Sequence, residues 1–110
     1  MRMKRDVRCL VGLVTCPDVV SAKKIAKCIV KEKLCACVNI LKNMESVFFW
    51  ENKVQKEKEV LLLIKTTDKN KVKLTKIIRK MHPYKVPEII FLEIQYGLDD
   101  FLAWIKKESS

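Results

Sequence analysis

The chain has 110 residues, 49% of them hydrophobic, and 23 lysines and arginines against 13 aspartates and glutamates. This length predicts one folded domain over residues 1–110, and the hydrophobic content excludes a disordered chain. No apolar run is long enough to cross a bilayer, whereas the net charge of +10 keeps nucleic acid, an anionic membrane surface and an anionic ligand open as partners.

The beginning of the chain does not have the pattern of a secretion signal. Residues 1–5 include basic side chains, but the apolar stretch at residues 10–14 is short and is soon followed by Pro17. The five cysteines are an odd number without a CxxC pair, which disfavours a disulfide framework and fits a reducing compartment. We therefore predict a cytoplasmic protein in which residues 1–6 are a flexible N-terminus.

The first two predicted elements are a buried strand and an amphipathic helix. Residues 9–15 are mostly apolar and are followed closely by Pro17, which is typical of a short buried strand. Asp18 is expected to be the N-cap of the helix that follows. The two faces of this helix are an apolar set, Ala22, Ile25, Ala26, Ile29 and Val30, and a basic set, Lys23, Lys24, Lys27 and Lys31.

A long β-hairpin is predicted next. Residues 35–50 alternate between apolar and polar positions, and the interruption at residues 42–45 indicates a bulge within one long strand. Residues 51–53 form the expected turn, in which Asn52 tolerates a positive φ. The return strand, residues 59–65, is apolar on both faces and is therefore expected in the middle of the sheet.

The remaining pattern predicts a helix, a strand and a further helix. Thr67 or Asp68 is expected to begin the second helix, and Pro83 to end it. Residues 89–94 are the fourth strand, and Asp99 is expected to cap a short final helix. The second helix again separates an apolar face, Leu74, Ile77, Ile78 and Met81, from basic residues, Lys71, Lys73, Lys76, Arg79 and Lys80.

The element order βαββαβ with a C-terminal helix predicts an α+β, ferredoxin-like fold with a four-stranded antiparallel sheet. Right-handed connections place the first and third strands in the middle. Two helices cover only one face of such a sheet, although the strands are apolar on both faces and Phe48, Phe49 and Trp50 lie near the hairpin. Another copy of the chain is the simplest cover for the second face.

Cysteine and histidine side chains are the candidate metal ligands. His82, the only histidine, lies in a segment stiffened by Pro83 and Pro87, where it can bind a soft or borderline metal or stabilise the helix C-terminus. Cys35 and Cys37 lie on one face of any strand, so they suit Cu(I) or are simply buried thiols. Both alternatives stay open for each site.

A series of short motifs, in order along almost the whole chain, resembles the motifs of a known protein family. The motifs are Thr15, Pro17-Asp18, the helix over residues 22–33, LCACVN (34–39), FWENK (49–53), EKEV (57–60), IKT (64–66), His82-Pro83-Tyr84, VPEI (86–89), Tyr96-Gly97 and FLAWI (101–105). Together they resemble the CutA divalent-cation tolerance proteins. The resemblance implies a homotrimer of ferredoxin-like subunits joined by edge pairing of the long second and third strands.

The resemblance also implies a likeness to the trimeric PII signalling proteins, which bind ligands in clefts between subunits. Trp50, Glu59 and Tyr84 are then the candidate residues of an intersubunit cleft or interface. A role in divalent metal tolerance, with copper as the candidate ligand, is the first hypothesis for function. The alternative is a structural or PII-like signalling trimer that binds an unknown small ligand or partner without a direct metal role.

The copper-binding pattern of bacterial relatives is incomplete in this chain. That pattern uses a first-strand cysteine, where this chain has Val14, and two adjacent histidines, where it has Met81 and His82. Cys16 lies two residues further along the strand, a shift of ~7 Å. His82, Cys16 and Met81 are therefore the candidate metal ligands, and their softness favours Cu(I).

Two other classes of function are disfavoured by the residues. RNA-recognition domains share the element order but need exposed aromatics on the first and third strands, whereas the third strand here is Val60–Ile64. The lysines are interpreted as solvated helix faces, so we predict no specific nucleic acid partner. No catalytic spacing or phosphate loop accompanies His82 and Tyr84, and Glu57 and Glu59 fit ion pairs better than catalysis, so we predict a non-enzyme.

Overall fold

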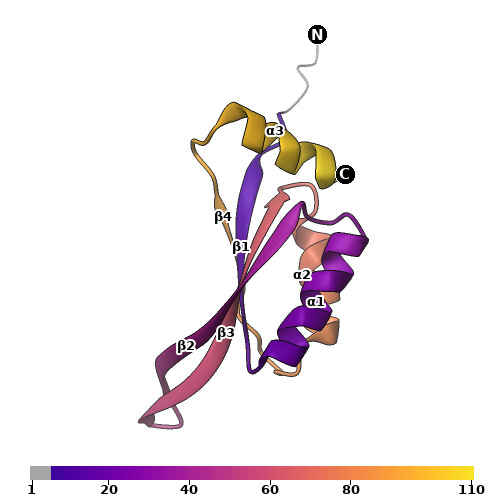
Figure 1. Ribbon diagram of the computed structural model, residues 1–110. Helices are drawn as coiled ribbons and strands as arrows, with labels where there is room; N and C mark the ends of the chain where they lie inside the picture. The colour runs from indigo at the N-terminus through magenta and orange to yellow at the C-terminus, as the bar shows by residue number, and fades with distance from the viewer. Residues whose placement is uncertain (1–5) are drawn as a thin grey trace.

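The computed structural model describes residues 6–110, and residues 1–5 of the expected flexible N-terminus lie outside that part. The described chain forms one four-stranded sheet with two helices on one face and a third across its end (Figure 1). The elements are β1 (Cys9–Cys16), α1 (Val19–Lys31), β2 (Cys37–Trp50), β3 (Lys53–Thr67), α2 (Lys71–Met81), β4 (Ile89–Glu93) and α3 (Asp99–Glu108).

The sheet has the order β2-β3-β1-β4, and all its strand pairs are antiparallel. This confirms the predicted α+β fold with the first and third strands in the middle. Val14 lies opposite Leu62 on one side and Ile89 on the other, and the neighbouring residue Leu13 lies opposite Leu63 and Ile90. Because side chains alternate along a strand, these two sets belong to opposite faces of the sheet.

The face with Val14 is the core of the molecule. Leu62 and Ile64 from β3 are fully buried there, beneath Ile29 of α1 and Ile78 of α2. Gly12 permits close packing at this level, because a Cβ on it would lie 2.9 Å from a ring carbon of Phe91.

The hairpin between β2 and β3 is longer than the sequence predicted. Its turn contains only Glu51 and Asn52, with φ of 51° and 63°, and Lys53 already pairs with Trp50. Positive φ at both positions is typical of the type I′ turn, whose twist suits a hairpin. The predicted start of β3 at residue 59 is therefore wrong, because the charged residues before it continue the pairing as an arm beyond the core.

The predicted bulge in β2 is confirmed. The register with β3 shifts between Leu41 and Met44, and Asn43 has a φ of 61°. The arm beyond this bulge carries exposed apolar side chains, since Phe49, Trp50 and Val54 are 68%, 59% and 66% exposed.

Two of the predicted helix starts are wrong. Asp18 does cap α1, because its Oδ1 accepts a hydrogen bond of 2.7 Å from the Ser21 amide. The second helix begins only at Lys71, because β3 continues to Thr67. Beyond it, the Asp68 amide donates a hydrogen bond to Arg8 O, next to the first residue of β1. In α3 the N-cap position belongs to Leu98, and Asp99 is already helical.

The second face of the sheet has no helix over its middle. In Figure 1, α1 and α2 lie together on one side, and α3 crosses the end of the sheet near the start of β1. There Cys9 Sγ donates to Leu102 O at 3.6 Å. On the uncovered face Leu41, Ile90 and Leu92 are 41%, 46% and 55% exposed.

Candidate functional site

The candidate site lies where α2 ends and the chain turns back toward β4. His82 is the C-cap of α2, and its amide donates to Ile78 O at 2.8 Å. Pro83 disfavours helical geometry at His82, which is extended with φ −73° and ψ 136°. The side chain faces the interior, and His82 is only 7% exposed.

Both ring nitrogens of His82 have backbone partners. Nε2 lies 2.7 Å from Thr15 O, and Nδ1 accepts a hydrogen bond of 3.0 Å from the Tyr84 amide. Since Nδ1 accepts, the proton of the neutral ring is on Nε2, which donates to the Thr15 carbonyl. A metal ion at either nitrogen must therefore displace one of these hydrogen bonds.

The other two candidate ligands have contrasting surroundings. Cys16 is fully buried, and burial, followed by the charges of Asp18 and Glu59, raises the pKa of its thiol to about 11. Metal ions bind the thiolate, so coordination there must overcome this preference for the protonated form. Met81, by contrast, is 38% exposed. The hypothesis that Cys16, Met81 and His82 form a Cu(I) site stays a prediction.

The structure describes no ready-made cluster of the usual metal ligands. Within residues 6–110 there is no group of three or more histidine, cysteine, aspartate and glutamate side chains placed to hold an ion. Val14, which the resemblance matched to the first-strand cysteine of the copper-binding pattern, is fully buried opposite Leu62.

The two cysteines near β2 do not share a strand face as expected. Cys35 precedes the first residue of the strand, Cys37, and lies in the core with 1% exposure. Burial, with a smaller effect of Cys37, raises the pKa of Cys35 to about 12. Cys37 is half-buried, and neither thiol is in a disulfide.

A second polar contact joins Tyr84 to β3. The Tyr84 hydroxyl donates to Glu59 Oε2 at 2.8 Å, and Glu59 is only 8% exposed. The rings of Tyr84 and His82 are tilted against each other with centroids 5.0 Å apart. The structure therefore links β1, α2 and β3 through the Thr15 carbonyl, His82, Tyr84 and Glu59.

This contact changes the acidity of the phenol. Burial, followed by the hydrogen bond to Glu59 and the charges of Glu59 and Glu57, raises the pKa of Tyr84 to about 12. In a Tyr96→Phe background, Tyr84 is the single tyrosine, and we expect its ultraviolet-monitored titration to fall near that value. Glu59→Gln should lower this pKa, because the amide carries no charge. An unchanged titration after Glu59→Gln would contradict the contact.

Trp50, the third predicted cleft residue, lies apart from this pair. It is paired with Lys53 at the tip of the arm, and the six residue steps from Lys53 to Glu59 span about 20 Å of strand. The structure therefore brings together Glu59 and Tyr84 but not Trp50 within one chain. The role of the Thr15 carbonyl could not be predicted from the sequence, since a backbone acceptor leaves no signal in residue type.

The geometry defines the class of protein as a ferredoxin-like α+β fold with an extended β2–β3 arm. A family model described as "CutA1 divalent ion tolerance protein" matches residues 10–108. The chain belongs to this family, which confirms the resemblance in its sequence motifs.

Relatives from plants and bacteria are similar over most of this chain. It is 45% identical over 105 residues to the chloroplastic protein CutA of Arabidopsis thaliana, covering 96% of this chain but 58% of that protein. It is 40% identical over 99 residues to the divalent-cation tolerance protein CutA of Thermus thermophilus, covering 90% and 96%. The chain thus spans little more than half the length of its plant relative.

Solved structures agree with the fold. The divalent cation tolerance protein of Thermus thermophilus superposes with a TM-score of 0.90 at 39% identity, covering 93% of this chain and 99% of that one. CutA1 from Oryza sativa gives a TM-score of 0.90 at 42% identity, with 94% of both chains covered. Among the helices of the described residues, none has the length and apolar character to span a membrane.

Proposed function

We propose that this protein is a homotrimeric divalent-cation tolerance protein whose ligand site lies between subunits, near Glu59 and Tyr84. The observation that supports the assembly is the uncovered sheet face. Leu13 and Leu63 lie opposite each other in its middle, and Ile90 and Leu92 are about half exposed at its edge. An apolar surface of this kind is typical of a face that meets another chain.

The β2–β3 arm supports the same assembly. It extends the molecule to 56 Å along its longest axis, against 27 and 26 Å along the others. Phe49, Trp50 and Val54 lie on this arm, far from the core of their own chain. A neighbouring subunit provides a surface that buries them, and edge pairing along the arm satisfies its free backbone groups.

This assembly gives Trp50 a role that one chain cannot provide. Within a chain Trp50 lies about 20 Å of strand away from Glu59. In a closed trimer the arm of one subunit can bring its indole toward the Glu59–Tyr84 pair of the next. The resulting cleft combines an aromatic wall with a buried carboxylate, a combination that suits a small ligand.

A copper role is proposed for the residues beside this cleft. The His82 ring is hydrogen-bonded to the carbonyl of Thr15, which precedes Cys16 in β1. Met81, the last residue of α2, directly precedes His82. These soft side chains suit Cu(I) under reducing conditions. Binding should be weak, because coordination must displace a hydrogen bond of His82 and deprotonate the buried Cys16 thiol.

The hydrogen-bonded imidazole favours the second candidate, a PII-like trimer that binds a small ligand in its clefts and has no direct metal role. Under either candidate the protein acts by binding, and we assign it no catalytic activity.

The five free cysteines support a location in the cytoplasm.

Native mass spectrometry of the purified protein tests the proposal directly. We expect a complex of three chains, each of 12.9 kDa, and any retained metal ion or small molecule should appear as added mass. A species of one chain at low micromolar concentration would contradict the assembly. A trimer that retains an organic ligand but no copper would favour the second candidate.

Cu(I) affinity distinguishes the two candidates further. Under reducing conditions, His82→Ala and Cys16→Ser should each weaken Cu(I) binding at least ~10-fold if those side chains are ligands. Competition with a chromogenic Cu(I) chelator measures the affinity, and circular dichroism checks that each variant is folded. Cys35→Ser is the matched thiol control. Loss of binding only in Cys35→Ser or Cys37→Ser would move the site to the start of β2.

A further inference from the structure

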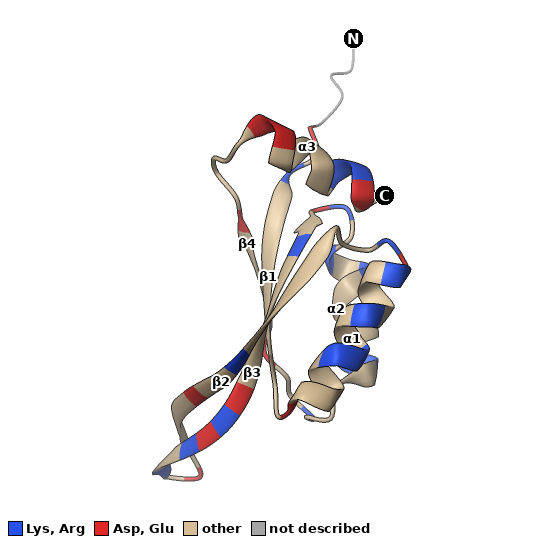
Figure 2. Ribbon diagram, in the orientation of Figure 1, with Lys and Arg blue, Asp and Glu red and all other residues tan. Residues whose placement is uncertain are grey.

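Charge is distributed unevenly over the molecule. Figure 2 shows red segments on the β2–β3 arm, on α3 and in several connections, whereas the only charged residues coloured on α1 and α2 are blue. The sequences of these helices, VVSAKKIAKCIVK and KVKLTKIIRKM, contain no aspartate or glutamate. The positive charge is therefore concentrated on the side of the sheet that the two helices cover.

The basic residues of each helix form one stripe. At 100° per residue, the four lysines of α1 lie within about 100° of its circumference, and four basic residues of α2 lie within about 120°. Each stripe is opposite the buried side of its helix, and every one of its members is exposed. We call these two stripes the basic helix face; its residues are Lys23, Lys24, Lys27, Lys31, Lys73, Lys76, Arg79 and Lys80.

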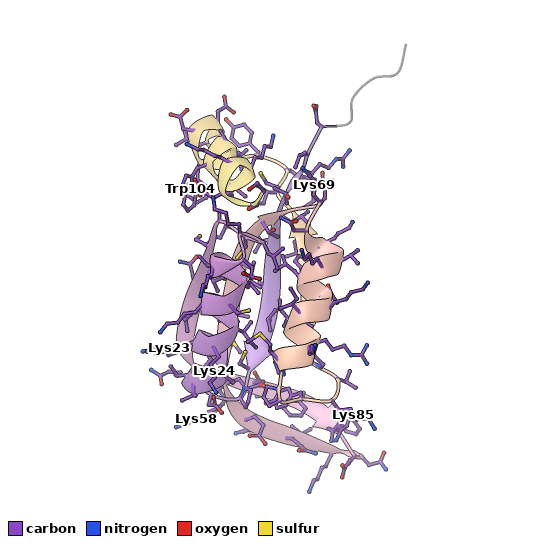
Figure 3. All side chains as sticks on the ribbon, turned by 90° about the vertical axis from the view of Figure 1, so that its right-hand side faces the viewer. Lys23, Lys24, Lys58, Lys69, Lys85 and Trp104 are labelled. Carbon is purple, nitrogen blue, oxygen red and sulfur yellow. The ribbon has the colours of Figure 1, made fainter. Side chains whose placement is uncertain are left out.

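The two stripes lie on one side of the molecule. Figure 3 views this side and shows α1 and α2 side by side in front of the sheet, with Lys23 and Lys24 projecting outward. The ion pairs found among residues 6–110, Arg8 with Glu93 and Lys33 with Glu108, do not involve this face. Eight like charges on two helices that contain no acidic residue repel one another, and an extended polyanion relieves that repulsion.

We propose that the basic helix face binds the phosphate backbone of double-stranded nucleic acid without sequence selectivity. Lysine is a flexible point charge that contacts phosphate but rarely fixes the paired contacts that read a base. Seven of the eight residues of the face are lysines. Neither helix contains an aromatic residue, so single strands find no stacking surface there.

The same composition disfavours an anionic membrane as the partner. Helices that bind at a membrane interface insert large apolar side chains such as Trp, Phe or Leu. Between the basic residues of the two stripes, the exposed apolar side chains are Val20 and Val72, at 67% and 61% exposure. Two valines provide little apolar surface for insertion into a bilayer. The lysines, by contrast, can contact the phosphates of a duplex without any insertion.

This binding mode goes beyond metal tolerance and does not depend on the proposed trimer. The basic helix face lies across the sheet from the uncovered apolar face, so assembly through the latter leaves it free (Figure 1). A trimer would carry three such faces, and a long duplex that contacts more than one of them would gain avidity.

Fluorescence anisotropy with a labelled duplex of mixed sequence tests the proposal on the full chain. We expect a Kd in the range of ~1 to 100 μM at physiological salt, with log K falling linearly as log salt rises. Each lysine that contacts phosphate contributes about 0.9 to the slope. The helix-face variant replaces four of them: Lys23→Gln, Lys27→Gln, Lys76→Gln and Lys80→Gln.

A second variant removes the same charge elsewhere. It carries Lys42→Gln and Lys53→Gln on β2 and β3, together with Lys106→Gln and Lys107→Gln on α3. The helix-face variant should lose more than ~10-fold in affinity at low salt, and its slope should decrease by about 3.6. The second variant should change the affinity less than ~3-fold and keep most of the slope. Circular dichroism and molecular mass confirm that both variants keep the native fold.

Three results would overturn the proposal. Equal losses in the two variants would mean that net charge alone attracts the duplex. Tighter binding of single-stranded than of double-stranded DNA would exclude the duplex backbone as the preferred partner. Binding to vesicles containing phosphatidylserine at a salt concentration that abolishes duplex binding would make the basic helix face a membrane surface instead.

Discussion

Replacing Leu63 with glutamate should convert the proposed trimer into monomers. Leu63 lies on β3 in the middle of the uncovered face, opposite Leu13 of β1 and Asn39 of β2. In an isolated chain this position borders solvent, so a carboxylate there leaves the core intact. In a trimer it would bury an unpaired charge in every subunit, at a cost of several kcal/mol each.

Light scattering coupled to gel filtration measures the result. The parent protein should have about three times the 12.9 kDa mass of one chain, and Leu63→Glu should have the mass of one. Val72→Glu is the matched control, because Val72 is 61% exposed on α2, on the other side of the sheet. A trimeric Leu63→Glu protein would contradict assembly through this face, and a monomeric Val72→Glu protein would contradict the choice of face.

Hydrophobic periodicity predicted the elements, and the right-handed connection rule predicted the sheet order. It failed where charged residues continue a strand. Lys56 and Lys58 pair with Val47 and Glu45 in the arm, although neither lies over the core. No local pattern marks such a strand, since what stabilises it is its partner strand. The start of α2 was misplaced for a related reason, because β3 continues to Thr67.

The candidate site could be predicted only in part. Pro83 correctly predicted the end of α2, which stops at Met81. The sequence could not show that the imidazole would face inward, because this depends on where β1 passes in three dimensions. Strand alternation does place Cys16 on the same face as Val14, and both are fully buried.

His82→Ala should destabilise the fold even when no metal is present. The imidazole is 7% exposed and connects β1 to the segment after α2 through Thr15 O and the Tyr84 amide. Removing it leaves a part-buried acceptor and a part-buried donor without their partner and opens a cavity beside the core. The expected loss is about 3 kcal/mol in the free energy of unfolding.

Urea unfolding with a chelator present, at fixed protein concentration, measures this loss. Met81→Ala is the matched control, because Met81 is adjacent in the chain but 38% exposed, and its loss should be below about 1 kcal/mol. If His82→Ala unfolds at the same urea concentration as the parent, the two hydrogen bonds contribute nothing to the fold. The imidazole would then be free to leave them for a metal ion, and His82 would be the stronger candidate for the copper ligand.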